Sequence, residues 1–275
     1  MSGLIHYVEP LLPTHYLSVA REHAGAVLIP LAELEQRTHE LPPPERLVCV
    51  IADSLGAYYA LGWLHARGRR ALLSNPPEDA PPTGRYRLWM PNEWLEAVCR
   101  CCASRHRPTA AGELPLALDL GCGSGREAVY LAARGWQVVA VDRLPEALAR
   151  GCDLQHRYAP NSAPIQWVCA DLEESDWQPE GAFDAILLFY FYSRTLIRRA
   201  CAWLNPRGML LVEAFTEAHR ARYGKPASDQ RIARLGELPR LLPDDMRLVA
   251  YSEGWRTNGR HTARLWAERT PACCC

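Results

Sequence analysis

The sequence has almost no lysine and no hydrophobic run long enough to cross a membrane. Lys225 is the single lysine among 31 basic residues, and 31 acidic residues bring the formal net charge to zero. A neutral chain creates no general field that would attract nucleic acid or an acidic membrane surface. The longest apolar run, Ala185–Tyr192, has the length of a buried strand, whereas a bilayer span needs about 20 residues. Charge and hydropathy therefore predict no membrane association and disfavour a nucleic-acid substrate.

A secretory signal and a disulfide framework are also missing. The first ten residues, MSGLIHYVEP, lack a basic region followed by an apolar stretch. The eleven cysteines are an odd number in irregular spacing, which is typical of reduced thiols. We therefore expect a cytoplasmic protein. Two groups, Cys99/Cys101/Cys102 and the terminal Cys273–Cys275, leave a metal or metalloid site open, but core packing and a frayed tail are the simpler interpretations, so no metal is predicted.

A proline-rich stretch divides the chain into two parts. SNPPEDAPPTGR, Ser74–Arg85, contains four prolines and few apolar residues, as an extended connector does. This composition predicts a small domain over residues 1–74, a linker over 75–85, a larger domain over 86–270 and a cysteine-rich tail over 271–275.

Short strands and a helix alternate in the first domain, which indicates a small α/β sheet. Apolar runs at Ala26–Ile29 and Leu47–Ala52 predict buried strands, and the segment that follows predicts a helix closed by Gly68. This pattern resembles a rhodanese-like domain, a family whose loop after the strand surrounds a nucleophilic cysteine with backbone N–H groups. The matching loop here, Ala52–Ala57, has no cysteine, and Cys49 lies inside the strand. The resemblance therefore implies a degenerate domain that has lost its chemistry.

A glycine-rich turn follows a buried strand, LALDL, in the second domain. Gly121, Gly123 and Gly125 precede a helical pattern, an arrangement in which backbone N–H groups approach a ligand closely. A dinucleotide fingerprint would need its third glycine at position 126, but that residue is Arg126. Asp119 stands two residues before the first glycine, where a carboxylate would attract the cationic part of a zwitterionic sulfonium ligand.

The next two strands also end in acids, at Asp142 and Asp171. A carboxylate at the end of the second strand can accept hydrogen bonds from both hydroxyls of a ribose. With the D-x-G-x-G-x-G turn, this order resembles the class I S-adenosylmethionine-dependent methyltransferases over about residues 86–270. The resemblance implies a Rossmann-like, doubly wound sheet of seven strands with S-adenosyl-L-methionine as cofactor. A finer likeness is to the small-molecule and tellurite-resistance-type members. The expected cofactor-binding residues are Asp119, Gly121, Cys122, Gly123, Gly125, Asp142, Arg143, Asp171, Leu172 and Phe189.

The methyl acceptor is expected beyond the fourth and fifth strands. Methyltransferases of nucleic-acid amines usually carry Asn/Asp-Pro-Pro-aromatic after strand four, and the sequence here, LFYFYS, has neither proline nor amide. Tyr190, Tyr192 and Glu213 stand near the ends of these strands, and we expect them to line the acceptor pocket as catalytic residues. Two alternatives remain open: the tyrosines pack in the core, and Glu213 pairs with an arginine instead of acting as a base. The segment Thr216–Leu241 predicts either a substrate lid or a surface helix pair.

The sequence thus predicts an α/β enzyme of two domains that transfers a methyl group from S-adenosylmethionine to a small-molecule acceptor. One alternative is a regulatory protein that senses this cofactor and contacts a protein partner through its first domain. The other is a nicotinamide-dependent oxidoreductase, against which Asp119 and Arg126 argue. Turnover of an acceptor separates the enzyme from the sensor, and the identity of the cofactor separates it from the oxidoreductase.

Overall fold

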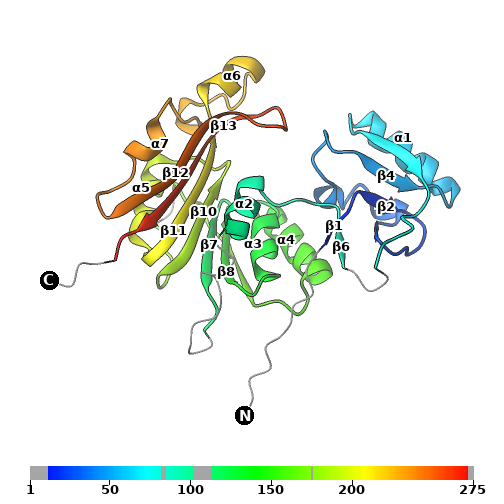
Figure 1. The fold of residues 1–275 in the computed structure, drawn as a ribbon, viewed down its shortest axis with the longest axis horizontal. Coiled ribbons are helices and arrows are strands. Elements are labelled where there is room, and N and C mark those ends of the chain that lie inside the picture. The colour runs from blue at the N-terminus through cyan, green and yellow to red at the C-terminus, as the bar shows by residue number, and fades with distance from the viewer. Residues whose placement is uncertain (1–11, 82–84, 102–112, 175, 272–275) are drawn as a thin grey trace, which may run out of the picture. The chain divides into compact units, whose positions relative to one another are not determined.

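The computed structural model describes residues 12–81, 85–101, 113–174 and 176–271 of the chain. The chain forms two compact units. The first contains the described residues up to Met90 together with Asp153–Asn161, and the second contains the described residues of Pro91–Cys152 and of Ser162–Cys275. Each unit has its own sheet (Figure 1), so both are α/β structures.

The first unit is built on a four-stranded parallel sheet in the order β3–β2–β4–β5. All four residues of β4 are buried, as expected for a parallel strand covered on both faces. A short parallel pair, β1 with β6, joins residues of this unit that lie far apart in the sequence. The elements are β1 (Leu12–Pro13), β2 (Tyr16–Ser18), β3 (Ala26–Leu28), η1 (Leu31–Glu33), η2 (Thr38–Glu40), β4 (Val48–Ile51), α1 (Leu55–Ala66), β5 (Ala71–Ser74) and β6 (Tyr86–Arg87).

The second unit contains a seven-stranded sheet in the order β12–β13–β11–β10–β7–β8–β9. Five strands are parallel, and β13 runs antiparallel to both β11 and β12, so the sheet is mixed. Figure 1 shows the long hairpin of β12 and β13 beside β11. The strands are β7 (Leu116–Leu120), β8 (Gln137–Asp142), β9 (Ile165–Cys169), β10 (Phe183–Phe189), β11 (Leu204–Phe215), β12 (Met246–Trp255) and β13 (His261–Arg269).

Helices cover both faces of this sheet, with α3 and α4 on one side and α5 and α7 on the other (Figure 1). The central strand β10 is buried over Ala185–Phe189. The core between sheet and helices is made mainly of leucine, isoleucine, valine and alanine, and it also contains Phe183, Tyr192, Cys201 and Met246. The helices are α2 (Glu93–Cys101), α3 (Arg126–Ala132), α4 (Pro145–Tyr158), α5 (Arg194–Ala202), α6 (Glu217–Tyr223), η3 (Asp229–Arg231) and α7 (Glu237–Arg240).

The predicted α/β sheet of seven strands is present. The sequence predicts strands over Leu116–Leu120 and Gln137–Asp142, and β7 and β8 have these bounds; the stretch Leu204–Phe215, which predicts a tight turn and a strand, is β11 over its whole length. The stretches Ile165–Asp171 and Phe183–Phe191 also predict strands, but β9 ends at Cys169 and β10 at Phe189, each two residues earlier. The region after β11, expected to be a lid or a helix pair, contains α6, η3 and α7. Within the described part of the chain, no helix combines the length and the apolar character that a membrane span requires.

Candidate cofactor and acceptor site

The glycine turn between β7 and α3 has a backbone that side chains rarely adopt. Gly121, Gly123 and Gly125 have φ angles of 73°, 53° and 68°, in the left-handed region that favours glycine. A Cβ on Gly121 would lie 2.6 Å from Phe191, and one on Gly125 would collide with Trp167. Nothing lies within 4 Å of the Cβ position of Gly123. The turn is therefore packed at both ends and open in the middle, where a ligand can approach the backbone.

Asp142, at the end of β8, connects this turn to the neighbouring strand. Its Oδ2 accepts a hydrogen bond from the backbone N–H of Gly123 at 2.8 Å, and its Oδ1 accepts one from that of Leu144 at 3.0 Å. Each carboxylate oxygen has a second lone pair that stays available for a donor. The two backbone contacts thus fix the orientation of the carboxylate without using up its capacity to accept hydrogen bonds.

A cavity of about 470 Å³ opens beside the turn, at the carboxyl ends of the parallel strands. Open α/β sheets bind ligands at this edge. Six of the ten predicted cofactor residues line it, and the other four lie in the turn itself or at the end of β7. The lining residues are Gly121, Asp142, Arg143, Leu144, Ala170, Asp171, Leu172, Glu173, Phe189, Tyr190, Phe191, Phe215, Pro226 and Arg231.

Asp119, at the end of β7, is a buried acid with one carboxylate oxygen, Oδ2, that has no hydrogen-bond partner among the described residues. Its side chain is 2% exposed. Burial, followed by the nearby carboxylates of Glu127 and Asp142, raises the pKa of Asp119 well above its usual value. Cys122 in the turn is buried as well, and burial raises the pKa of its thiol. Cys122 is therefore no thiolate nucleophile, and Asp119 is an acid that a bound cation would stabilise.

Asp171 lies just after β9 and remains an ionised group. Its Oδ1 accepts hydrogen bonds from the backbone N–H groups of Glu173 at 2.9 Å and Glu174 at 3.3 Å, and the Arg143 guanidinium lies 3.6 Å from Oδ2. The hydrogen bond from Glu173 is the main cause that lowers the pKa of Asp171. Asp142 and Asp171 thus present two oriented carboxylates to the same cavity.

Tyr190 also lines the cavity and follows directly after β10. Its φ angle is 59°, unusual for a residue with a side chain, and such a conformation costs on the order of 1–3 kcal/mol. Its backbone N–H donates to the carbonyl oxygen of Glu213 at 2.8 Å, which holds it there. Burial raises the pKa of Tyr190 to about 12. The phenol is therefore neutral near neutral pH and does not serve as a base.

Tyr192 and Glu213 do not line this cavity, which differs from the expectation that they contact the acceptor. Tyr192 is 1% exposed and packs in the core. Glu213 is fully buried and lies 3.0 Å from Nε of Arg264. Thr262 Oγ1 also donates to it at 2.7 Å. Core packing and pairing with an arginine, the alternatives left open by the sequence, describe these two residues.

Asn92 is a buried partner of Glu213 that the sequence reasoning missed. Its Nδ2 donates to Oε2 of Glu213 at 2.8 Å, its backbone N–H donates to Glu127 at 2.9 Å, and its Oδ1 accepts from the N–H of Trp94 at 2.8 Å. The residue therefore caps α2 and attaches it to α3 and β11. An asparagine directly before an acidic helix start is a capping signal that predicts the cap but not the two carboxylate contacts.

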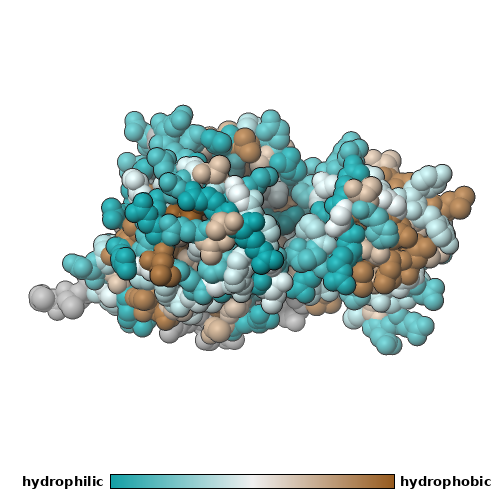
Figure 2. All heavy atoms as spheres, turned by 90° about the horizontal axis from the view of Figure 1, so that it is seen from above, coloured by the Kyte–Doolittle hydropathy of each residue, from teal (hydrophilic) through white to brown (hydrophobic). Residues whose placement is uncertain are grey.

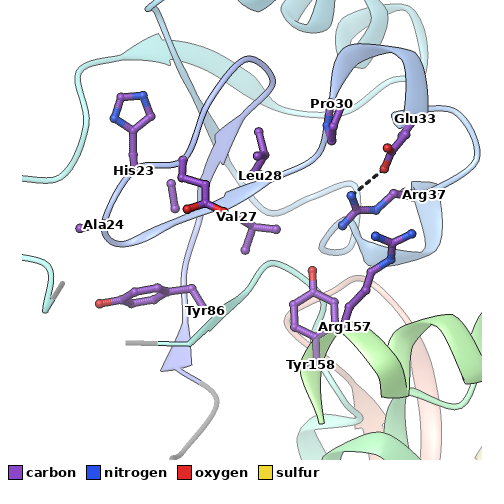
Figure 3. A pocket seen from close by; sticks show the side chains of 12 residues that line it. His23, Ala24, Val27, Leu28, Pro30, Glu33, Arg37, Tyr86, Arg157 and Tyr158 are labelled. Carbon is purple, nitrogen blue, oxygen red and sulfur yellow. Dashed lines mark hydrogen bonds and ion pairs between the residues drawn. The ribbon is translucent and has the colours of Figure 1, made fainter. Parts of the chain in front are cut away.

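A larger cavity, about 630 Å³, lies in the first unit (Figure 3). Its principal charged side chain, Arg37, bonds to Glu33 at 3.0 Å and to both oxygens of Glu40 at 2.6 and 2.7 Å. The Tyr158 hydroxyl also donates to Glu40, at 2.6 Å. His23 bonds to Asp53 at 2.8 Å. These polar groups already form hydrogen bonds with one another, so this cavity offers a ligand fewer available hydrogen-bonding groups than the site beside the glycine turn.

No group of three or more histidine, cysteine or acidic side chains able to hold a metal ion exists within the described residues. Cys99 and Cys101 lie on α2, the first half-buried and the second exposed. Cys102 and the terminal Cys273–Cys275, which the sequence singled out with them, fall outside the described residues.

Sequence comparison adds to this geometry. Residues 117–208 match the family model of the methyltransferase domain. An uncharacterised methyltransferase of Mycobacterium tuberculosis is 37% identical over 103 residues, which are 36% of this chain and 49% of that protein. A ubiquinone biosynthesis O-methyltransferase of Xanthomonas oryzae is 32% identical over 130 residues, 45% of this chain and 52% of that protein. The chain spans about half the length of the curated relatives it matches.

Solved structures share the fold of the second unit. TehB from Haemophilus influenzae aligns with a TM-score of 0.50 and 20% identity, over 64% of this chain and 62% of that one. The magnesium protoporphyrin IX methyltransferase of Synechocystis aligns with a TM-score of 0.50 and 16% identity, over 65% and 82% of the two chains. Residues 117–208, around the glycine turn, thus carry a methyltransferase domain of a family that typically uses S-adenosylmethionine as methyl donor, and the solved structures share its fold.

Proposed function

We propose that this chain transfers a methyl group from S-adenosylmethionine to a small molecule bound in the cavity beside the glycine turn. The observation that carries the proposal is that the lining of that cavity combines two kinds of residue. The carboxylates and the glycine turn form one set, the first side, and the aromatic residues Tyr190, Phe191 and Phe215 form the other, the second side. One side fits a nucleoside with a cationic amino-acid group, and the other fits an organic acceptor.

The residues of the first side fit the cofactor. Asp142 has free lone pairs for the ribose hydroxyls, Asp171 and the backbone of Leu172 stand where the adenine is expected, and Asp119 attracts a positive charge. The open space at Gly123 leaves room for the ligand against the backbone. When bound, S-adenosylmethionine supplies an electrophilic methyl group on a sulfonium.

The residues of the second side position the acceptor and exclude water, and they supply no obvious base. Tyr190 is neutral, Glu213 is buried and paired with Arg264, and no histidine is among the described lining residues. In-line transfer requires mainly that the acceptor be held at a near-attack distance. We therefore propose an acceptor whose nucleophilic atom is already ionised or soft, so that no proton has to be removed by the protein. The finer likeness to tellurite-resistance-type enzymes stays a prediction.

The two alternative functions, an oxidoreductase and a protein that senses the cofactor, are not equally well supported. The family match over residues 117–208 favours a methyltransferase over a nicotinamide-dependent oxidoreductase. A protein that only senses the cofactor would bind it equally well, so turnover must decide. The protein incubated with isotopically labelled S-adenosylmethionine and a metabolite extract should yield a labelled product by mass spectrometry. Absence of any labelled product across extracts would favour the sensor.

Calorimetry tests the cofactor side directly. The purified chain should bind S-adenosylmethionine and S-adenosylhomocysteine with low-micromolar affinity typical of cofactors, and should not bind NAD. Asp142→Ala removes a charged acceptor of two hydrogen bonds and should weaken binding by about 1.5–3 kcal/mol, roughly 10- to 150-fold. Glu146→Ala is the matched control, because this acid is exposed on the first turn of α4 and does not line the cavity. Tight NAD binding, or unchanged affinity in Asp142→Ala, would refute the assignment.

For the first unit we propose a degenerate rhodanese-like domain. The parallel order β3–β2–β4–β5, with α1 directly after β4, supports this. The loop over Ala52–Ala57 carries no cysteine, and burial raises the pKa of Cys49 on β4. In Figure 2 apolar side chains gather on the surface of this unit, and Leu55 on α1 is 80% exposed. That this unit contacts a protein partner stays a prediction.

A further inference from the structure

An ion pair joins two distant segments of the chain at the cavity beside the glycine turn. Glu173 follows β9, directly after Leu172, and Arg231 belongs to η3. Both residues line the cavity, and the Arg231 guanidinium pairs with the Glu173 carboxylate. Each of the two side chains is also 33% exposed to solvent. Groups that line a cavity and are reached by solvent lie at its mouth, so this ion pair lies at the mouth of the cavity.

Arg231 also contacts an aromatic ring of the lining. Its guanidinium lies over the Phe191 ring, 5.3 Å from the ring centre. Phe191 in turn packs closely on the glycine turn, because a Cβ on Gly121 would lie 2.6 Å from it. Arg231 thus connects Glu173 at the end of β9 with a ring that rests on the turn where the cofactor is expected.

The segment that carries Arg231, residues 224–231, is fixed to the rest of the unit at both ends. At its start the backbone N–H of Gly224 donates to the carbonyl oxygen of Arg220 at 2.7 Å, which closes α6. Just after its end the N–H of Ala233 donates to the carbonyl oxygen of Phe215 at 2.8 Å, at the end of β11. These backbone bonds leave the segment as a loop that can move about two fixed points.

Two ion pairs attach this segment between its ends. Asp229 pairs with Arg220 of α6, the helix directly before the segment, and Arg231 pairs with Glu173 on the other segment. Pro226 lines the cavity together with Arg231, so the segment covers part of it. Exposed ion pairs are weak, and loops held by few interactions open locally with little free energy. Breaking the pair between Arg231 and Glu173 would therefore free the segment from the end of β9.

From these contacts we propose that residues 224–231 are a lid over the cofactor cavity and that the ion pair of Arg231 with Glu173 is its latch, which opens each time the cofactor enters or leaves. This inference rests on the proposed function, because it takes the cavity as the cofactor site. A latch that opens for passage in both directions slows association and dissociation by the same factor and leaves the affinity unchanged. Lids of this kind often limit turnover through product release, so the pair sets how fast S-adenosylhomocysteine is exchanged for fresh donor.

The rate constants of S-adenosylhomocysteine binding and release test the latch. Stopped-flow tryptophan fluorescence measures them, since Trp167 packs against the glycine turn. Glu173→Gln and Arg231→Gln should each raise both rate constants by about two- to fivefold, the size that exposed ion pairs reach, with the Kd within about twofold. The double variant should be no faster than the single ones, because the second substitution has no pair left to break. Exchanging the two charges, Glu173→Arg with Arg231→Glu, should bring both rates back to within about twofold of the wild type.

Salt gives a second test of the same pair. Raising KCl from about 0.05 to about 1 M screens exposed charges, so it should speed association and dissociation in the wild type. The double variant Glu173→Gln with Arg231→Gln has no pair to screen, and its rates should not change with salt.

Asp245→Asn is the matched control. Asp245 pairs with Arg269 at 3.2 Å, and the two side chains are 48% and 30% exposed, but neither residue lines the cavity. The control variant should keep both rate constants of the wild type. A measurement that needs no cofactor uses Lys225, the single lysine of the chain, which is exposed within the lid. The anisotropy of a dye attached to Lys225, with its position confirmed by mass spectrometry, should fall in Glu173→Gln and not in Asp245→Asn, because a released lid moves more freely.

The other outcomes overturn the latch. Unchanged rates in Glu173→Gln and Arg231→Gln, or rates that the charge exchange does not restore, mean that the pair holds nothing closed. A changed Kd without parallel changes in both rates, or loss of binding in the variants alone, means that these residues contact the cofactor, and the proposed function then stands without this inference. If the wild type does not bind S-adenosylhomocysteine, the proposed function fails. The anisotropy of the dye then decides about the lid, and an equal value in the wild type and Glu173→Gln overturns it.

Discussion

Replacing Asp119 by asparagine should stabilise the protein and weaken its cofactor site at the same time. The side chain is 2% exposed, Oδ2 has no hydrogen-bond partner among the described residues, and the carboxylates of Glu127 and Asp142 lie nearby. A buried charge among like charges destabilises the folded state. Asparagine has nearly the same shape and removes the charge, so it removes this cost together with the attraction for a cation.

The pH dependence gives the sign and the size of the effect. Burial raises the pKa of Asp119 in the folded protein, so between the ordinary value of about 4 and the raised value the native state binds more protons than the unfolded chain. Its free energy of unfolding therefore falls as the pH rises through that window. One pKa unit corresponds to about 1.4 kcal/mol. We expect Asp119→Asn to be more stable than the wild type by about 1–3 kcal/mol near neutral pH, and to match it near pH 4.

Urea denaturation across this pH range and calorimetry with two ligands measure both effects. S-adenosylmethionine has a sulfonium charge that S-adenosylhomocysteine lacks, so Asp119→Asn should weaken the first ligand more than the second, by about tenfold for the first. Glu146→Gln, an exposed acid on α4, controls for the loss of one negative charge. A variant that is less stable than the wild type near neutral pH, or a stability difference that does not change with pH, would refute the reasoning.

Three further substitutions test other parts of the structure. Tyr190→Ala should lower turnover of the identified acceptor at least tenfold, about 1.4 kcal/mol, with cofactor affinity within twofold; loss of cofactor binding instead would place Tyr190 on the cofactor side. Gly151→Ala puts a Cβ 2.5 Å from the Trp167 ring and should lower the free energy of unfolding by about 1–3 kcal/mol. In a Trp167→Leu background the same substitution should raise it by up to about 1 kcal/mol, as helix propensity predicts, and denaturation curves of the four proteins measure both effects. Neither the wild type nor Cys49→Ser should form thiocyanate from thiosulfate and cyanide. An active wild type whose activity is lost in Cys49→Ser would contradict this prediction.

The parts of the fold that could be predicted are those set by long apolar runs. Strands β7 and β8 have their predicted bounds, because buried parallel strands are nearly continuous in apolar residues. Strand β9 ends early because Asp171 accepts hydrogen bonds from Glu173 and Glu174 and turns the chain. Strand β10 ends early because Tyr190 takes a positive φ. Such local hydrogen bonds and dihedral angles leave no signal in an apolar pattern.

The gathering of the predicted cofactor residues at one cavity was predictable for a topological reason, and the surroundings of the predicted acceptor residues were not. Gly121, Asp142 and Asp171 follow successive parallel strands, whose carboxyl ends meet at one edge of the sheet, and they line one cavity. Beyond Phe189 the alternation of strand side chains no longer applies, so the direction of Tyr192 could not be derived. The partners of Glu213 come from distant segments, with Asn92 121 residues away. Contacts of that separation depend on tertiary packing alone.

The charges at the edge of the sheet are distributed so that one buried acid keeps no partner of opposite charge. Glu213 is neutralised by Arg264, and Arg231 by Glu173. Asp119 has no such counter-ion among the described residues. If Asp119 contacts the cofactor as proposed, it attracts a donor that carries a sulfonium more strongly than its demethylated product, which favours exchange of product for fresh donor after each transfer. On that proposal, the stability lost by keeping Asp119 buried is converted into discrimination between the two states of the cofactor.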